Sequence, residues 1–256
     1  PDSSYPSYHQ ANGDSYQPKI SNDGDLVAFS SRASNIVEND TNKQLDVFLH
    51  RRSTGENYRI SESYYGEGGD KASYYPDISA DGRYVVFASR ADNLYSSDNN
   101  GDRDLYIYNV NNRNLTWVDL SQSGIDGLRI PNAPSISGDG TYISFTGKTS
   151  QGYAAYLWNK NTWKAKKISP DYNPDGTIST SPGKTEVSDN GNYVTYALDG
   201  NIYKYNIQTE ENELISVGIN LETANGSSSI PSISADGKYI VYKSFANNLI
   251  EDDTNG

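Results

Sequence analysis

The sequence contains no cysteine and no methionine, and only two of its 256 residues are histidines. Without cysteine the chain can form no disulfide, no thiol nucleophile and no cysteine-based zinc site. The two histidines, His9 and His50, lie far apart in the sequence, which argues against a histidine zinc site. No Gly-x-Ser-x-Gly motif is present and no Ser/His/Asp set stands out, so the sequence offers no recognisable machinery for nucleophilic hydrolysis.

Basic residues and long apolar runs are also scarce. The chain has 21 Lys and Arg against 33 Asp and Glu, which gives a net charge of −12. Nucleic acids and anionic membrane surfaces are bound by basic patches, so neither is an expected partner. No stretch approaches the ~20 apolar residues of a membrane span, so we expect no membrane insertion. The composition still favours a folded protein, because 22 tyrosines supply apolar area that disordered chains lack.

A repeated phrase, Pro-x-Ile-Ser-x-Asp-Gly followed by an alternating apolar strand, dominates the sequence. It begins at Pro18, Pro76, Pro134 and Pro231, and a degenerate copy begins at Thr185. The serines of the phrase recur every 46 to 58 residues, and this period marks a repeat architecture. We expect an N-terminal segment at 1–17, four repeats at about 18–75, 76–133, 134–184 and 185–230, and an incomplete repeat at 231–256.

Each repeat has the pattern of four short strands. In the second repeat we expect strands at 76–80, 84–87, 104–109 and 115–118, with Asp81-Gly82 as the tight turn between the first two. The recurring Asp-Gly pairs are interpreted as structural turns, because glycine adopts the positive φ and aspartate bonds the turn. Four antiparallel strands per unit without helical periodicity predict an all-β β-propeller. The chain 1–256 is expected to be a single domain with four complete blades and a half blade.

At these residues the chain resembles the PD40, or TolB-like, WD40-type β-propeller repeats. The resemblance is carried by Pro76-Asp-Ile-Ser-Ala-Asp-Gly-Arg-Tyr-Val-Val-Phe and by Asp104-Leu-Tyr-Ile-Tyr, and it spans almost the whole chain. It implies the propeller fold. It says little about function, because such propellers serve as binding platforms, scaffolds and appended domains of hydrolases.

Every long polar segment is expected on one face of the propeller. With strands running a-b-c-d, the b–c loops and the d–a connections emerge together, and loops displayed on a rigid scaffold commonly carry binding sites. Aromatic side chains in or near these loops suit stacking on sugar rings or contact with a protein partner. They would equally serve to cover blade edges. These aromatic residues are Tyr64, Tyr65, Tyr74, Tyr75, Tyr153 and Tyr172.

The b–c loops of the first two repeats share the spacing Asp-x-Asn-x-x-x-Asp, 58 residues apart. Closely spaced oxygen ligands in a flexible loop suit Ca²⁺, which takes six to eight oxygens. The alternative is that these side chains bond loop amides as structural Asx turns. The third and fourth repeats lack the acidic loop, which weakens any general metal requirement. The predicted calcium ligands are Asp40, Asn42, Asp46, Asp98, Asn100, Asp102 and Asp104.

The two ends of the chain carry further expectations. The sequence opens on Pro1 without an initiating methionine and holds three sequons, at Asn39, Asn114 and Asn225. We therefore expect the chain to begin after a removed leader or at an internal boundary. An extracellular or cell-surface location is favoured, with the periplasm as the alternative. The incomplete last repeat either continues in further chain or leaves an open sheet edge that invites another strand.

Three functional hypotheses follow from these observations. The first is a non-catalytic binding or structural module that engages a protein or glycan through the long-loop face, with Ca²⁺ stiffening two loops. The second is a polysaccharide hydrolase or lyase that uses loop carboxylates, which predicts two carboxylates in a deep central pocket. The third is a subunit of a filament or surface layer, formed by strand exchange through the half blade.

Overall fold

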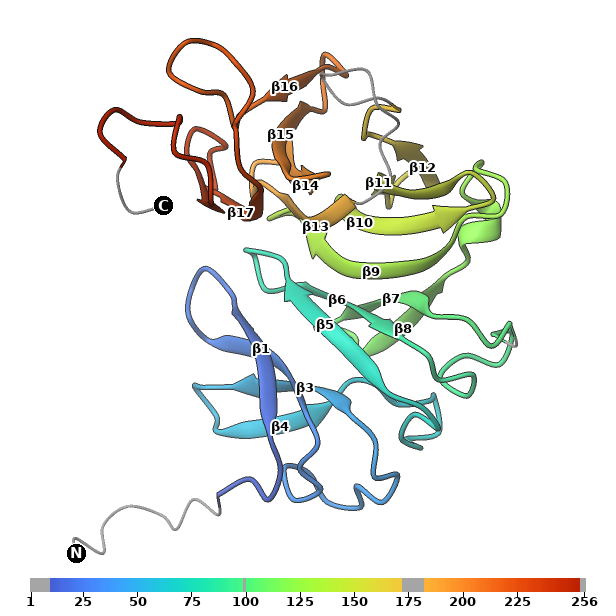
Figure 1. The fold of residues 1–256 in the computed structure, drawn as a ribbon. Helices are drawn as coiled ribbons and strands as arrows, with labels where there is room; N and C mark the ends of the chain where they lie inside the picture. Colours follow the sequence, from blue (N-terminus) through green and yellow to red (C-terminus); the bar gives the residue numbers. More distant parts are fainter. Residues whose placement is uncertain (1–9, 99, 172–181, 254–256) are drawn as a thin grey trace, which may run out of the picture.

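The computed structural model describes residues 10–98, 100–171 and 182–253, which form small antiparallel sheets that follow one another in chain order (Figure 1). The first two sheets contain β1 (Ser15–Ile20), β2 (Leu26–Ser31), β3 (Asp46–Arg51), β4 (Glu56–Arg59), β5 (Ser73–Ile78), β6 (Tyr84–Ser89), β7 (Asp104–Asn109) and β8 (Asn114–Val118). The next two contain β9 (Arg129–Ile136), β10 (Tyr142–Thr149), β11 (Gly152–Asn159), β12 (Lys164–Lys167), β13 (Pro182–Val187), β14 (Tyr193–Leu198), β15 (Asn201–Asn206) and β16 (Asn212–Leu214). The last contains β17 (Ser228–Ile233) and β18 (Ile240–Ser244).

The predicted all-β architecture of four complete blades and a half blade is confirmed. Each four-stranded sheet pairs its strands in sequence order, and β17 and β18 form a two-stranded sheet. A short 3-10 helix, Leu120–Gln122, follows β8. Within the described residues, we find no helix with the length and apolar character that a membrane crossing requires.

The first strand of each blade begins earlier than the repeated phrase suggests. β5 starts at Ser73 rather than at residue 76, and its pairing with β6 shifts register between Tyr74 and Asp77. Tyr75, at the shift, has a φ of 55°. The following proline has no N–H to give to a sheet, which fits a bulge position. The same shift places the start of β1 at Ser15, inside the segment expected to precede the first repeat.

The core lies between neighbouring sheets. Leu26 and Val47 of the first blade pack with Phe87 and Tyr106 of the second, and the next two joints are built in the same way. At one level of each complete blade, an aromatic side chain of the second strand stacks on one of the third, which adds to the area burial. The four pairs are Phe29–Phe48, Phe87–Tyr106, Phe145–Tyr156 and Tyr196–Tyr203.

The Asp-Gly turns join the blades on the side opposite the long loops. In the second blade the Ser79 hydroxyl donates to Asp81 at 2.7 Å, and Gly82 has a φ of 70°. The backbone N–H of Asp81 donates to the carbonyl of Gly138 in the third blade at 3.1 Å. Gly140 of that third blade lies against the ring of Tyr84. The turns are therefore structural, as the sequence predicted, and each also holds its neighbour.

Candidate functional site

The largest of the described depressions lies between the first two blades and extends from their long loops along β4 to the β7–β8 hairpin. It has a volume of about 1050 Å³. Its walls come from the β2–β3 loop, β4, the β4–β5 connection, the β6–β7 loop and the β7–β8 hairpin. We call it the tyrosine groove, because Tyr58, Tyr64, Tyr65, Tyr95 and Tyr108 line it.

Two adjacent tyrosines of the groove are almost entirely exposed. The exposed fractions are 94% for Tyr64 and 86% for Tyr65, and their rings meet edge to face with centroids 5.4 Å apart. Rings that cover a blade edge would be buried, so these two rings do not have that role, and ligand binding at this pair stays a prediction. The ring of Tyr95 is partly covered by the ring of Trp117, and the two ring centroids are 6.1 Å apart.

The polar side of the groove is held by an ion-pair network. The guanidinium of Arg59, which is 8% exposed, contacts Asp40 at 3.3 Å and Glu62 at 3.5 Å. Burial raises the pKa of Glu62, although Arg59 opposes this. Asn57 and Asn93 also line the groove. Amide, guanidinium and carboxylate groups beside exposed rings provide donors and acceptors for a hydroxyl-rich ligand.

The other predicted loop aromatics have different surroundings. Tyr74 lies beneath the guanidinium of Arg103 at 5.4 Å, and its ring contacts Tyr75 at 6.0 Å. Tyr153 is 46% exposed and carries the Lys148 ammonium over its ring at 5.2 Å. Tyr172 lies outside the described residues. Of the predicted loop aromatics that the structure describes, only Tyr64 and Tyr65 combine near-complete exposure with a groove.

The predicted calcium residues of the first blade form a closed hydrogen-bond network. The two carboxylate oxygens of Asp46 accept hydrogen bonds from Asn42 Nδ2 at 2.8 Å and from the Ser61 hydroxyl at 2.7 Å. Asp40 pairs with Arg59. The amide oxygen of Asn42 accepts the backbone N–H of residue 44 at 3.0 Å, as in an Asx turn. The neighbouring groups thus satisfy these side chains.

The second blade leaves two buried carboxylate oxygens without a hydrogen-bond donor. They are Oδ1 of Asp98 and Oδ2 of Asp104, in residues that are 4% and 6% exposed. The hydroxyl of Tyr106 donates to the other oxygen of Asp98, while Asn100 and Trp117 donate to the other oxygen of Asp104. Burial raises the pKa of Asp104 to about 6. Burial also raises the pKa of Asp46, where hydrogen bonds from Ser61 and Asn42 oppose the rise, so the two loops differ in their hydrogen bonding and not in the direction of the shift.

Calcium binding stays a prediction for both loops. Among the described residues, no three Asp, Glu, His or Cys side chains are already gathered around one point. Amide oxygens, backbone carbonyls and water are further calcium ligands, and Asn42 and Asn100 belong to that class. Asp102 is partly exposed and lies 3.9 Å from Arg129.

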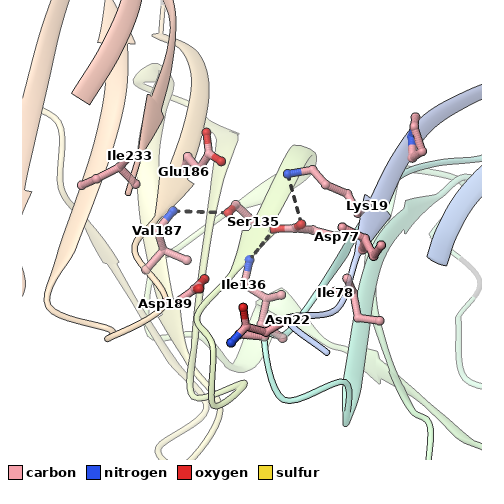
Figure 2. A pocket seen from close by; sticks show the side chains of 13 residues that line it. Lys19, Asn22, Asp77, Ile78, Ser135, Ile136, Glu186, Val187, Asp189 and Ile233 are labelled. Atoms are coloured by element: carbon pink, nitrogen blue, oxygen red, sulfur yellow. Dashed lines mark hydrogen bonds and ion pairs between the residues drawn. The ribbon is translucent and has the colours of Figure 1, made fainter. Parts of the chain in front are cut away.

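A second, smaller pocket lies where the first strands of all five sheets meet, which places it on the propeller axis (Figure 2). Its volume is about 270 Å³. The Lys19 ammonium contacts Asp77 at 3.2 Å, and Asp77 also accepts the backbone N–H of Ile136 at 3.0 Å. Glu186 and Asp189 line the same pocket. Burial and the carboxylates of Asp77 and Glu186 raise the pKa of Asp189.

The residues of this axial pocket were not among the predicted site residues, although one variable position of the repeated phrase indicates them. The position after the initial proline or threonine varies more than its neighbours, which are proline and isoleucine in every copy but the degenerate one. It is Lys19 in the first repeat, Asp77 in the second, Ser135 in the third and Glu186 in the fourth. All four line the pocket. A variable position inside a constant phrase therefore marked the axis.

The last sheet exposes several large apolar side chains. Tyr239 is 72% exposed, and Val241 and Phe245 are each 68% exposed. Among the strands of the described residues, β18 pairs with β17 alone. Self-association through this half blade stays a prediction.

Comparison with known proteins supports the fold through structure rather than sequence. No family model matches the chain, and no curated protein matches it. Among solved structures, TolB from Acinetobacter baumannii has 15% identity and a TM-score of 0.53 over 91% of this chain and 54% of its own. Putative TolB from Agrobacterium tumefaciens has 15% identity and a TM-score of 0.56 over 92% of this chain and 76% of its own.

An oligogalacturonate lyase solved in complex with manganese is also similar. It has 12% identity and a TM-score of 0.59 over 90% of this chain and 58% of its own. This chain thus spans little more than half the length of two of these three proteins. Likeness at such low identity reports architecture and not activity. The fold is that of the TolB-like β-propellers, as the repeated PD40-type phrase predicted.

Proposed function

We propose that this chain is a non-catalytic binding module of an exported protein and that it recognises an oligosaccharide in the tyrosine groove. The observation that carries the proposal is the exposed pair Tyr64 and Tyr65 at a groove of about 1050 Å³. Small-ligand sites commonly occupy ~300–1,000 Å³. The groove reaches this range, whereas the axial pocket of about 270 Å³ falls below it.

The groove also has the chemistry that a sugar requires. Aromatic rings offer flat apolar faces to the C–H face of a pyranose, and the surrounding polar groups meet its hydroxyls. The ion pairs of Arg59 with Asp40 and Glu62 hold part of this wall in place before binding, which limits the ordering cost. The net charge of −12 favours a neutral glycan over an acidic one.

A glycan array with the purified chain tests the proposal, and calorimetry with the strongest oligosaccharide measures the affinity. We expect the double variant Tyr64→Ala/Tyr65→Ala to bind more than about tenfold more weakly, a loss of at least ~1.4 kcal/mol. Tyr153→Ala is the matched control, because this loop tyrosine is exposed but does not line the groove. Equal binding by the double variant and the wild type would contradict the proposal, as would capture of peptides alone. Fractionation of the source cells tests export.

The axial pocket supports a second candidate, an enzyme acting on polysaccharide. Asp77, Glu186 and Asp189 bring three carboxylates to one pocket, and burial raises the pKa of Asp189 in the direction that a general acid requires. A reducing-end assay over neutral and acidic polysaccharides tests this candidate. Turnover that is lost in Glu186→Gln would establish it, and absence of turnover would leave the binding module.

A further inference from the structure

The acidic loops of the first two blades occupy equivalent positions, and the 58-residue spacing extends beyond them. Asp46 of the first blade corresponds to Asp104 of the second. In the fourth strand and just after it, Arg59 and Ser61 of the first blade correspond to Trp117 and to an aspartate. The groups that surround the two equivalent carboxylates therefore differ in charge.

In the first blade the protein itself supplies the compensating groups. Arg59 places a buried positive charge against Asp40 at 3.3 Å. Ser61 donates a hydrogen bond to Asp46 at 2.7 Å, and Asn42 donates to its second oxygen. Burial raises the pKa of Asp46, and these hydrogen bonds together with Arg59 oppose the rise and stabilise the anion.

The second blade has no equivalent of the Arg59 guanidinium or of the Ser61 hydroxyl. The neutral indole of Trp117 takes the place of the guanidinium and donates to one oxygen of Asp104 at 3.0 Å. Asp119 takes the place of Ser61 and adds a carboxylate where the first blade has a donor. Oδ2 of Asp104 and Oδ1 of Asp98 are left buried and without donors. An unpaired buried charge is strongly destabilising, so a bound cation would stabilise the ionised form of this carboxylate.

A cavity of about 560 Å³ lies beside these groups. Asp104 lines it together with Asn100, Asp102 and Asp119. Arg129 also lines it, but its contact with Asp102 is 3.9 Å long between exposed side chains and compensates little for the buried Asp104. Carboxylate and amide groups, which are ligands of hard divalent cations, thus form part of the cavity wall, and Leu120 and Leu128 form another part.

We infer that the second blade binds Ca²⁺ at Asp104 and that the first blade needs none, because Arg59 provides its positive charge internally. Asn100, Asp102 and Asp119 line the same cavity, but they do not surround one point together with Asp104 in the described structure, so they must move toward it to complete the donor set. Water supplies the remaining ligands. The buried carboxylate of Asp98 adds negative potential nearby. This inference concerns one loop and does not depend on the glycan groove.

Terbium luminescence and thermal unfolding test the site. Trp117 donates to the proposed ligand Asp104, so excitation of tryptophan should sensitise bound Tb³⁺, and Ca²⁺ should displace it. We also expect Ca²⁺ to raise the melting temperature of the EDTA-treated protein. Asp104→Asn should weaken Ca²⁺ binding by more than about tenfold, whereas the matched first-blade variant Asp46→Asn should bind Ca²⁺ as the wild type does.

A charge exchange keeps the test decisive if Asp104→Asn fails to fold. Trp117→Arg gives the second blade the guanidinium that Arg59 provides in the first. In EDTA this variant should therefore melt at a higher temperature than the wild type, and Ca²⁺ should raise its melting temperature by less. Absence of both terbium luminescence and a calcium-dependent shift in the wild type would overturn the inference. Loss of binding in Asp46→Asn with binding kept in Asp104→Asn would overturn it as well.

Discussion

Replacing Gly140 with alanine probes the joint between the second and third blades. Gly140 has a φ of 74°, and a Cβ built on it would overlap the ring of Tyr84, at 3.0 Å from Cε2 and closer still to Cδ2. The ring cannot move away freely, because Tyr84 packs against the core between the second and third blades, and the ammonium of Lys160 lies 3.6 Å from its centroid on one face. Gly24 is a matched control, since it has the same turn and a φ of 71°, but its nearest neighbour would be 4.0 Å away.

Gly140→Ala and Gly24→Ala should lower the free energy of unfolding by different amounts. The left-handed backbone costs an alanine roughly 1–2 kcal/mol at either position. Overlap with a packed ring adds about 1–3 kcal/mol at Gly140 only. We therefore expect the free energy of unfolding to fall by about 2–5 kcal/mol in Gly140→Ala and by about 1–2 kcal/mol in Gly24→Ala.

Urea denaturation followed by tryptophan fluorescence measures both variants, with linear extrapolation to water. Gly55→Ala is a second control, because Gly55 has a φ of 75° and no atom within 4 Å of the added Cβ. Equal losses in all three variants would refute the reasoning, since the cost would then be backbone strain alone and the tyrosine contact would contribute nothing.

Further predictions concern hydrogen bonds at buried and exposed carboxylates. Ser61→Ala should lower the free energy of unfolding by about 1–3 kcal/mol. The loss should exceed that of Ser169→Ala, because the Ser61 hydroxyl bonds buried Asp46 as well as a backbone N–H. Similar losses for the two variants in calorimetry would contradict this. A hydrogen bond from Ser234 is the main reason why the pKa of Asp236 is lowered to about 2, so NMR titration of Ser234→Ala should give a higher pKa. Because the folded pKa lies below the ordinary value of ~3.9, the associated stability is fully present above that pH and is lost as the pH falls toward about 2. An unchanged pKa in the variant would refute the assignment. The tyrosine pair of the groove is so exposed that its double alanine variant should change the free energy of unfolding by no more than about 0.5 kcal/mol per residue in the same urea assay, and a larger loss would show a structural role.

The sequence was sufficient for the blade pattern because the repeated phrase contains both its turn and its strand. It did not reveal the early start of β5 at Ser73, because a bulge before Pro76 interrupts the alternation of side chains. The near-complete exposure of Tyr64 could not be predicted from the sequence either. A tyrosine in a loop and the fully buried Tyr106 in a strand are the same residue type, and their burial depends on which segments pack against them.

The candidate calcium site shows a different kind of gap. The two acidic motifs have the same spacing, and every position of the first, including Asp46, has its equivalent 58 residues later, at Asp104 for Asp46. The motifs alone therefore predicted two equivalent sites. Their difference lies in the fourth strand, where Arg59 is matched by Trp117. The sequence contained that substitution, but its meaning required knowing that the fourth strand packs beside the loop. Side-chain contacts across strands were the missing information.

The contact between a tyrosine and the next turn glycine has an evolutionary consequence. Tyr84 meets Gly140, Tyr142 meets Gly191 and Tyr193 meets Gly237, so three successive joints use one pair of residue types. A duplicated unit inserted between two others would bring its own glycine to the preceding tyrosine and its own tyrosine to the following glycine. Gene duplication and loss can therefore change the number of blades without compensating substitutions in the flanking units.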